Sequence, residues 1–264
     1  MYDFEFLRAG TIEEVVEALS KDEDAQPLSG GQTLIPTMKQ RLAMPTTLVS
    51  LMAIPELRGV CVDDEGRVCI GAATTHADVA HHAGAPYPAL AALAGQIGDP
   101  AVRSRGTIGG SLANNDPSAC YPAAALASNA LIRTNARDID ADSFFEGMFA
   151  TALEPGEIIT QVVFPVPDAA AYVKFAQPAS RFALVGVFVA RFFDGVRVAV
   201  TGASGDGVFR WTEAEEALTA DFKPDALASL SAPSDGMIGD IHGSPEYRAH
   251  LVGVVTRRAV AAAG

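Results

Sequence analysis

Apolar positions along this 264-residue chain follow two patterns, one typical of strands and one typical of helices, which alternate over short stretches. Residues 4–8 and 47–51 have the density of apolar side chains that is typical of short strands. After Thr11 the apolar residues are spaced as on one face of a helix, and Glu14 completes a capping-box pattern. We therefore predict a helix that ends near Ser20, and a second helix over residues 33–41 with Pro36 in its first turn.

The middle of the chain predicts a hairpin followed by small helices. Residues 58–71 read as two strands joined at Gly66, and a turn centred on Glu65 would place Cys61 opposite Cys69. Further helices are expected over residues 75–81, capped by Thr75, over residues 87–97, and from Pro117 through residues 123–128. Strands are expected over residues 131–134 and 158–164.

A change of pattern after residue 164 predicts a domain boundary. Residues 165–168 contain two prolines and are followed by a run of small residues. Beyond them we expect three strands, over residues 172–176, 183–193 and 196–202, with Asp194-Gly195 as a tight-turn signal between the last two. Two helices should follow, around residues 212–218 and 244–263. We expect an α+β protein with one domain over residues 1–167 and a smaller one, with an antiparallel sheet, over 168–264.

Charge and composition limit the possible partners. A formal net charge of −13 argues against nucleic acid, whose phosphates are held by lysine and arginine. No apolar run approaches the roughly 20 residues that cross a bilayer, and the first residues do not resemble a signal peptide. We expect a cytoplasmic protein with no membrane span.

Three cysteines, none in a Cys-x-x-Cys pair, make an iron–sulfur or zinc site within this chain unexpected. If Cys61 and Cys69 do face each other, a reducing cytosol opposes a disulfide, and we interpret them as small apolar residues.

Two glycine-rich segments, residues 28–34 and 106–117, are the strongest candidates for a ligand site. Each contains a Gly-Gly pair, which lets backbone amides approach a ligand and form a concave nest for an anion. Two nests could hold the two phosphates of a dinucleotide, although one such segment alone is more often an ordinary turn. Neither a Gly-x-Gly-x-x-Gly fingerprint nor a Gly-x-x-x-x-Gly-Lys-Ser/Thr loop occurs, which weakens the nicotinamide-dinucleotide and ATP interpretations.

Other chemistry is weakly indicated. His76, Asp78, His81 and His82 have a composition loosely typical of metal sites, but their spacing matches no zinc motif, and we interpret them as part of a surface helix. No nucleophile with an adjacent base is visible, as expected where a cofactor supplies the chemistry.

The chain resembles the FAD-binding medium subunits of the molybdenum hydroxylases, the group that includes carbon monoxide dehydrogenase and xanthine dehydrogenase. Five segments carry the resemblance in the family's order: residues 28–41, 97–111, 156–165, 171–187 and 244–260. The resemblance implies a two-subdomain FAD-binding domain of the type also found in vanillyl-alcohol oxidase, with FAD extended between the subdomains.

Carried over position by position, the resemblance implies a set of FAD-contacting residues. They are Leu28, Ser29, Gly30, Gly31, Gln32, Thr33, Leu34, Ile97, Thr107, Gly109, Gly110, Ser111, Asn114, Cys120, Ile159 and Lys174. Lys174 matches a lysine that reaches the flavin end, whereas Cys120 stands where the family commonly has an aspartate, and we expect it in the adenosine half. Ile97, Ile159 and Lys174 also have ordinary interpretations, as core residues or a solvated lysine. Arg103 and Arg105 are expected to have structural or interface roles.

The resemblance also implies the partners. A molybdopterin-binding large subunit would oxidise the substrate, a small subunit would carry two [2Fe–2S] clusters, and this chain would pass electrons through FAD to an external acceptor. The complex would be a dimer of heterotrimers. Two alternatives stay open: a stand-alone FAD oxidoreductase of the same fold, and an assembly subunit without cofactor.

Overall fold

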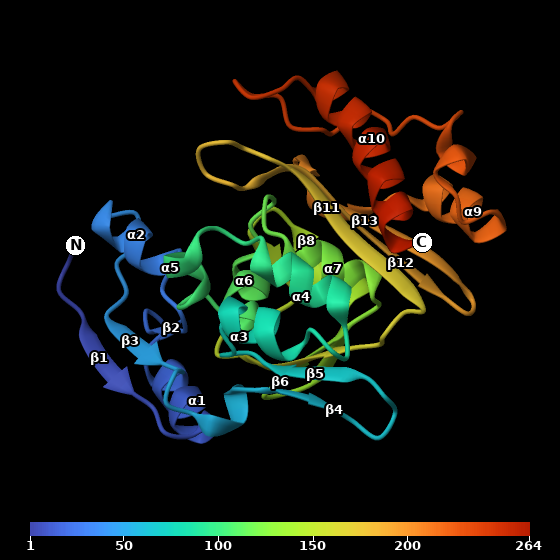
Figure 1. Ribbon diagram of the computed structural model, residues 1–264. Coiled ribbons are helices and arrows are strands. Elements are labelled where there is room, and N and C mark those ends of the chain that lie inside the picture. Colours follow the sequence, from blue (N-terminus) through green and yellow to red (C-terminus); the bar gives the residue numbers. More distant parts are fainter.

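A small parallel sheet forms the amino-terminal subdomain. The computed structural model describes all 264 residues and places this sheet, with its two helices, at the blue end of the molecule (Figure 1). The strand order is β1-β3-β2. The elements are β1 (Glu5–Arg8), α1 (Ile12–Lys21), β2 (Gln26–Leu28), α2 (Leu34–Lys39) and β3 (Thr47–Ser50). Thr11 accepts a hydrogen bond from the Glu14 amide, which confirms the predicted start of the first helix.

An antiparallel five-stranded sheet follows, in the order β4-β5-β10-β6-β7. Its strands are β4 (Val60–Val62), β5 (Val68–Gly71), β6 (Leu131–Thr134), β7 (Asp138–Asp140) and β10 (Ile159–Phe164). Cys61 pairs directly with Cys69 across the β4–β5 hairpin, as the turn position predicted, and both thiols are free.

Short helices pack on this sheet. They are α3 (His76–His82), α4 (Pro88–Gly95), α5 (Pro100–Arg103), α6 (Ile108–Asn114), α7 (Tyr121–Ala127) and α8 (Ala141–Phe144), and the last leads into the hairpin β8 (Phe145–Gly147) and β9 (Ala150–Thr151).

The prediction that Pro117 begins a helix is wrong. The Asp116 side chain accepts a hydrogen bond from the Ser118 amide, which closes a turn there instead. The helix starts at Tyr121, and the proline in its first turn is Pro122.

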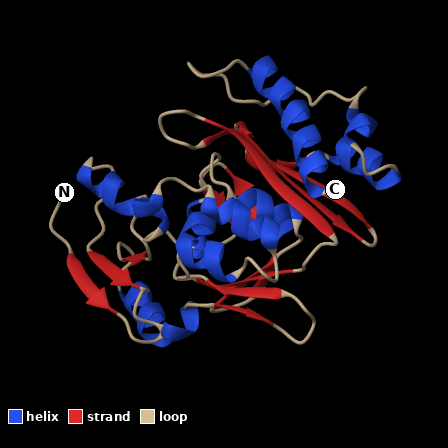
Figure 2. Ribbon diagram, in the orientation of Figure 1, coloured by secondary structure: helices blue, strands red, loops and turns tan.

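A second antiparallel sheet, β11-β12-β13-β14, lies on the other side of the helices (Figure 2). It is formed by β11 (Ala169–Ala176), β12 (Ala183–Phe192), β13 (Gly195–Ser204) and β14 (Gly207–Arg210), and its outer face is covered by α9 (Thr212–Ala220) and α10 (Pro245–Ala263). The expected α+β architecture with a carboxy-terminal antiparallel sheet is confirmed.

The buried Arg248 ties α10 to this sheet. Its guanidinium donates to the carbonyl oxygens of Leu184 at 2.8 Å and Gly202 at 2.7 Å, and to the Asp240 carboxylate at 2.8 Å. One buried cation therefore holds a helix, two strands and the preceding loop together.

Candidate functional site

A cavity of about 700 Å³ lies where the amino-terminal subdomain meets the central sheet and its helices. Its wall also includes β11 and the β11–β12 loop. All sixteen residues that the sequence singled out line it: Leu28, Ser29, Gly30, Gly31, Gln32, Thr33, Leu34, Ile97, Thr107, Gly109, Gly110, Ser111, Asn114, Cys120, Ile159 and Lys174. Residues from both sequence domains are thus gathered around one cavity.

The first glycine segment connects β2 to α2 and presents free backbone donors. The five successive amides of residues 29–33 donate to no acceptor in the chain. Gly31 has a φ of +68°, a left-handed conformation that glycine adopts without strain. Unpaired amides in a turn of this kind form the concave, positively polarised surface that binds a phosphate.

The second glycine segment is not a nest, which corrects the expectation of two. Thr107 caps a helix, and Gly109 and Gly110 lie in its first turn. The Ile108 and Gly109 amides donate to the carbonyl oxygens of Thr74 and Ala72, and the Gly110 amide donates to the Thr107 hydroxyl. What this segment offers a ligand is the small Gly110 surface with the polar side chains of Ser111 and Asn114.

The two segments pack directly against each other. A Cβ atom added to Gly30 would lie 2.0 Å from the Arg105 carbonyl oxygen, and one added to Gly110 would lie 3.8 Å from Cβ of Ser29. The close approach of two backbones at Gly30 fixes the distance between the free amides of the first segment and the small residues of the second.

Arg103 has the structural role that was expected. Its Nη1 donates to the carbonyl oxygens of Ile97 and Gly98, both at 3.0 Å, and so holds the end of α4 against α5.

His76 departs from the surface interpretation. It lies 5 % exposed on the cavity wall, packed against Tyr121, and only His81 and His82 are on the surface. Burial, and secondarily Arg103, lower the pKa of His76 to about 4, so its ring is neutral at physiological pH.

Lys174 reaches into the same cavity from β11. Its ammonium donates to the carbonyl oxygens of Gln96 at 2.8 Å and Arg181 at 2.9 Å, and its Nζ lies 3.7 Å from Sγ of Cys120. Lys174 is therefore not a freely solvated lysine. The two side chains touch, so they contribute to one part of the cavity wall, whereas the resemblance implied contacts with opposite halves of the cofactor.

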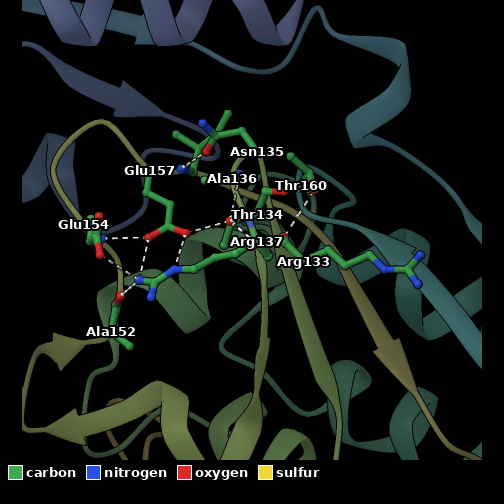
Figure 3. A network of polar contacts seen from close by, with 10 residues as sticks. Arg133, Thr134, Asn135, Ala136, Arg137, Ala152, Glu154, Glu157 and Thr160 are labelled. Atoms are coloured by element: carbon green, nitrogen blue, oxygen red, sulfur yellow. Dashed lines mark hydrogen bonds and ion pairs between the residues drawn. The ribbon is translucent and has the colours of Figure 1, made fainter.

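Glu157 is a cavity residue that sequence reasoning did not select. Its carboxylate accepts hydrogen bonds from Thr134 Oγ1 at 2.7 Å, from the Glu154 amide at 2.8 Å, and from Arg137 Nε and Nη2 at 3.1 Å each (Figure 3). The Arg137 hydrogen bond, above all, lowers the pKa of Glu157 to about 2. This network fixes the start of β10, where Ile159 lines the cavity.

The β11–β12 loop also supplies walls that the sequence did not indicate. Ser180, Arg181 and Phe182 line the cavity, and Ser180 and Phe182 also line a smaller neighbouring cavity of about 230 Å³ that extends to Arg248. Glu157 and this loop are far from the glycine segments in the sequence but close to them in space, so no local pattern connects them. The one available signal was that both lie within segments that resemble the family.

A cavity of this size, with a row of free amides at one side and a cation at another, defines a binding site for an extended anionic cofactor such as a dinucleotide. Residues 2–167 match the family model for the FAD-binding domain in molybdopterin dehydrogenase.

Relatives of known function match over nearly the whole chain. The nicotine 6-hydroxylase medium subunit of Paenarthrobacter nicotinovorans is 36% identical over 96% of this chain and 95% of its own. The carbon monoxide dehydrogenase medium chain of Afipia carboxidovorans is 36% identical over 97% and 95%. Among solved structures, carbon monoxide dehydrogenase from Oligotropha carboxidovorans superposes with a TM-score of 0.89 at 32% identity, covering 99% of this chain and 98% of that chain.

The chain thus belongs to the FAD-binding medium subunits of the molybdenum hydroxylase family, as its motifs indicated, and FAD is its cofactor. It is an oxidoreductase subunit. No helix combines the length and the apolar character needed to cross a membrane. No group of three or more histidine, cysteine, aspartate or glutamate side chains is arranged to hold a metal ion.

Proposed function

We propose that this chain carries electrons within a molybdenum-dependent hydroxylase or dehydrogenase. It receives them from a small subunit with two [2Fe–2S] clusters and passes them to an external acceptor, while a molybdopterin-binding large subunit oxidises the substrate. Two copies of each of the three subunits form the complex. The observation that carries the proposal is the single cavity that gathers all sixteen motif residues around five free amides.

The residues on the cavity wall fit FAD and suggest how it is held. The amides of residues 29–33 would donate to the pyrophosphate, and the hydroxyl and amide groups of Ser111 and Asn114 would donate from the facing helix. Ile97 and Ile159 would contact apolar parts of the cofactor, and Lys174 and Cys120 would contact one end of it together. When bound, FAD supplies the redox chemistry, accepting electrons from one partner and releasing them to another.

The protein's own contribution is position and charge. The Lys174 ammonium, held between two carbonyl oxygens, is a fixed cation that favours negative charge on a neighbouring group. His76 is neutral and buried on the cavity wall, so it adds no charge beside the cofactor.

The experiment is to purify the native complex and the separately expressed chain. We expect about one FAD per chain, identified after denaturation by its oxidised-flavin absorbance and its separation from FMN. We also expect a small cysteine-rich partner and a large one, and reduction of the flavin by the reduced iron–sulfur partner. A complex without extractable flavin would instead support an assembly subunit, and full substrate turnover by the isolated chain would support a stand-alone oxidoreductase.

A further inference from the structure

An exposed aromatic residue at the tip of the β8–β9 hairpin has a backbone conformation that its side chain disfavours. Phe149 has a φ of +56° and its side chain is 57 % exposed, next to Met148 at 43 %. Phe149 is the third of the four residues in the turn from Gly147 to Ala150, a position where a positive φ is normally taken by glycine or asparagine. A bulky residue in this conformation is uncommon.

The rest of the structure holds this tip firmly. Asn115, itself buried at the end of α6, donates from Nδ2 to the carbonyl oxygens of Gly147 and Ala150, both at 2.8 Å. The Phe149 amide donates to the Asn115 carbonyl oxygen at 3.1 Å. Three hydrogen bonds to one buried residue therefore present two large apolar side chains to solvent in a fixed geometry, which lowers the entropic cost of binding through them.

The tip stands beside the cofactor cavity. Asn114 and Asp116, the neighbours of Asn115 in the chain, both line that cavity, and so does Leu153 shortly after β9. A protein bound at Met148 and Phe149 would thus be close to the cofactor, as an electron donor must be.

Two exposed acidic side chains lie near the tip, and the charge of the first, Glu146, also acts on Arg137. Glu146 is exposed and forms no ion pair. Asp206 is also exposed and unpaired, and it lies near the tip because the next residue, Gly207, packs against the Gly147 backbone. No lysine or arginine occurs from Asp138 to Glu157. A second copy of this acidic chain is a poor partner for such a surface, whereas an apolar pocket with a basic rim is complementary to it.

We propose that Met148 and Phe149 insert into an apolar pocket with a basic rim on the iron–sulfur subunit, an inference that rests on the proposed function. This contact sets the position of the electron donor relative to the FAD cavity.

The substitution Phe149→Gly separates docking from folding, because it removes the side chain and relieves the positive φ at once. We expect the variant to melt at a higher temperature than the wild-type chain but to bind the purified iron–sulfur subunit at least tenfold more weakly in a titration. Phe193→Ala is the matched control: Phe193 is fully exposed on the β12–β13 turn, and its loss should leave binding unchanged.

The outcomes distinguish this inference from the proposed function. Equal binding by wild type and Phe149→Gly, or a loss confined to the large subunit, would overturn the inference alone. A wild-type chain that binds no iron–sulfur subunit would overturn both. Weaker binding with a lowered melting temperature would show that Phe149 serves the fold, and would also overturn the inference.

Discussion

At the scale of single residues, Gly30 sets the distance between the two glycine segments. Its missing side chain lets the first segment lie against the Arg105–Gly106 backbone, and a Cβ would lie 2.0 Å from a carbonyl oxygen that belongs to the main chain. Because backbone cannot move aside as the end of a flexible side chain can, the two segments must separate when this position is enlarged.

We therefore predict that Gly30→Ala lowers the free energy of unfolding by about 1–3 kcal/mol and reduces the FAD content of the purified chain. Thermal melting and flavin absorbance measure the two effects. Gly95→Ala is the control, since a Cβ there meets nothing within 4 Å at the end of α4, and it should be neutral or stabilising. A Gly30→Ala protein with wild-type melting and flavin content would show that the segments do not depend on this contact.

A second prediction at this scale concerns acid sensitivity. The pKa of Glu157 falls from 4.5 to about 2 in the folded chain, so its ionisation stabilises the fold above the unfolded-state pKa, and that contribution is lost as the pH falls from 4.5 towards 2. Glu157→Gln should be less stable at pH 7 and lose less stability on acidification over that range, as urea unfolding at each pH would show. Glu154→Gln, which removes a 74 % exposed carboxylate 3.6 Å from Arg137, is the control. Parallel pH profiles for wild type and Glu157→Gln would contradict the argument.

At the scale of elements, the β11–β12 loop is fastened to the body of the molecule by Lys174. The ammonium joins the Arg181 carbonyl oxygen in the loop to the Gln96 carbonyl oxygen at the end of α4. Without it the loop that lines both cavities has one fewer attachment to the rest of the fold.

We predict that Lys174→Met exposes this loop to protease. Each lost hydrogen bond to the charged group costs about 1.5–3 kcal/mol, which corresponds to a tenfold or greater rise in loop opening. Trypsin should cleave after Arg181 correspondingly faster in the variant, as peptide mass analysis would reveal. Lys223→Met removes an exposed lysine paired with Asp221 and should leave the rate unchanged. If both variants are cut at the wild-type rate, Lys174 does not fasten the loop.

Elements with local signals were predictable from the sequence, and those set by distant contacts were not. Thr11 and Thr75 cap helices as predicted, and the hairpin register that pairs Cys61 with Cys69 followed from its turn. The helix predicted at Pro117 is wrong because the adjacent Asp116 side chain closes a turn first. The second glycine segment begins a helix because Thr107 caps it and because Thr74 and Ala72, remote in sequence, accept its first amides.

The same distinction applies to the site. The motif residues were found because each belongs to a short segment that resembles the family, and the fold brings all of them to one cavity. Contacts between segments left no local pattern: the touching of Lys174 and Cys120, and the hydrogen bonds that tie Glu157 to Arg137, join residues more than 15 positions apart.

At the scale of the whole molecule, the layers alternate as sheet, helices, sheet, helices (Figure 2). The largest hydrophobic cluster lies between the two sheets and includes Tyr172, Phe188, Ala190 and Ala199 of the carboxy-terminal sheet together with side chains of the central one. The predicted boundary after residue 167 therefore passes through a shared core, although the family model also ends there.

A shared core predicts that the two sequence domains do not fold independently. Domains that fold alone bury their own hydrophobic cores, whereas residues 1–167 without the carboxy-terminal sheet would expose one face of α4 and α7, which contact β11, β12 and β13. They would also lack Lys174 and the β11–β12 loop from the cavity wall. We expect the fragment of residues 1–167 to bind a hydrophobic dye and to retain no FAD, and the full chain to unfold in one transition by both circular dichroism and flavin fluorescence. Two separate transitions in the full chain, or a fragment that melts cooperatively with FAD bound, would show that the boundary in the sequence is also a boundary in the energetics of the fold.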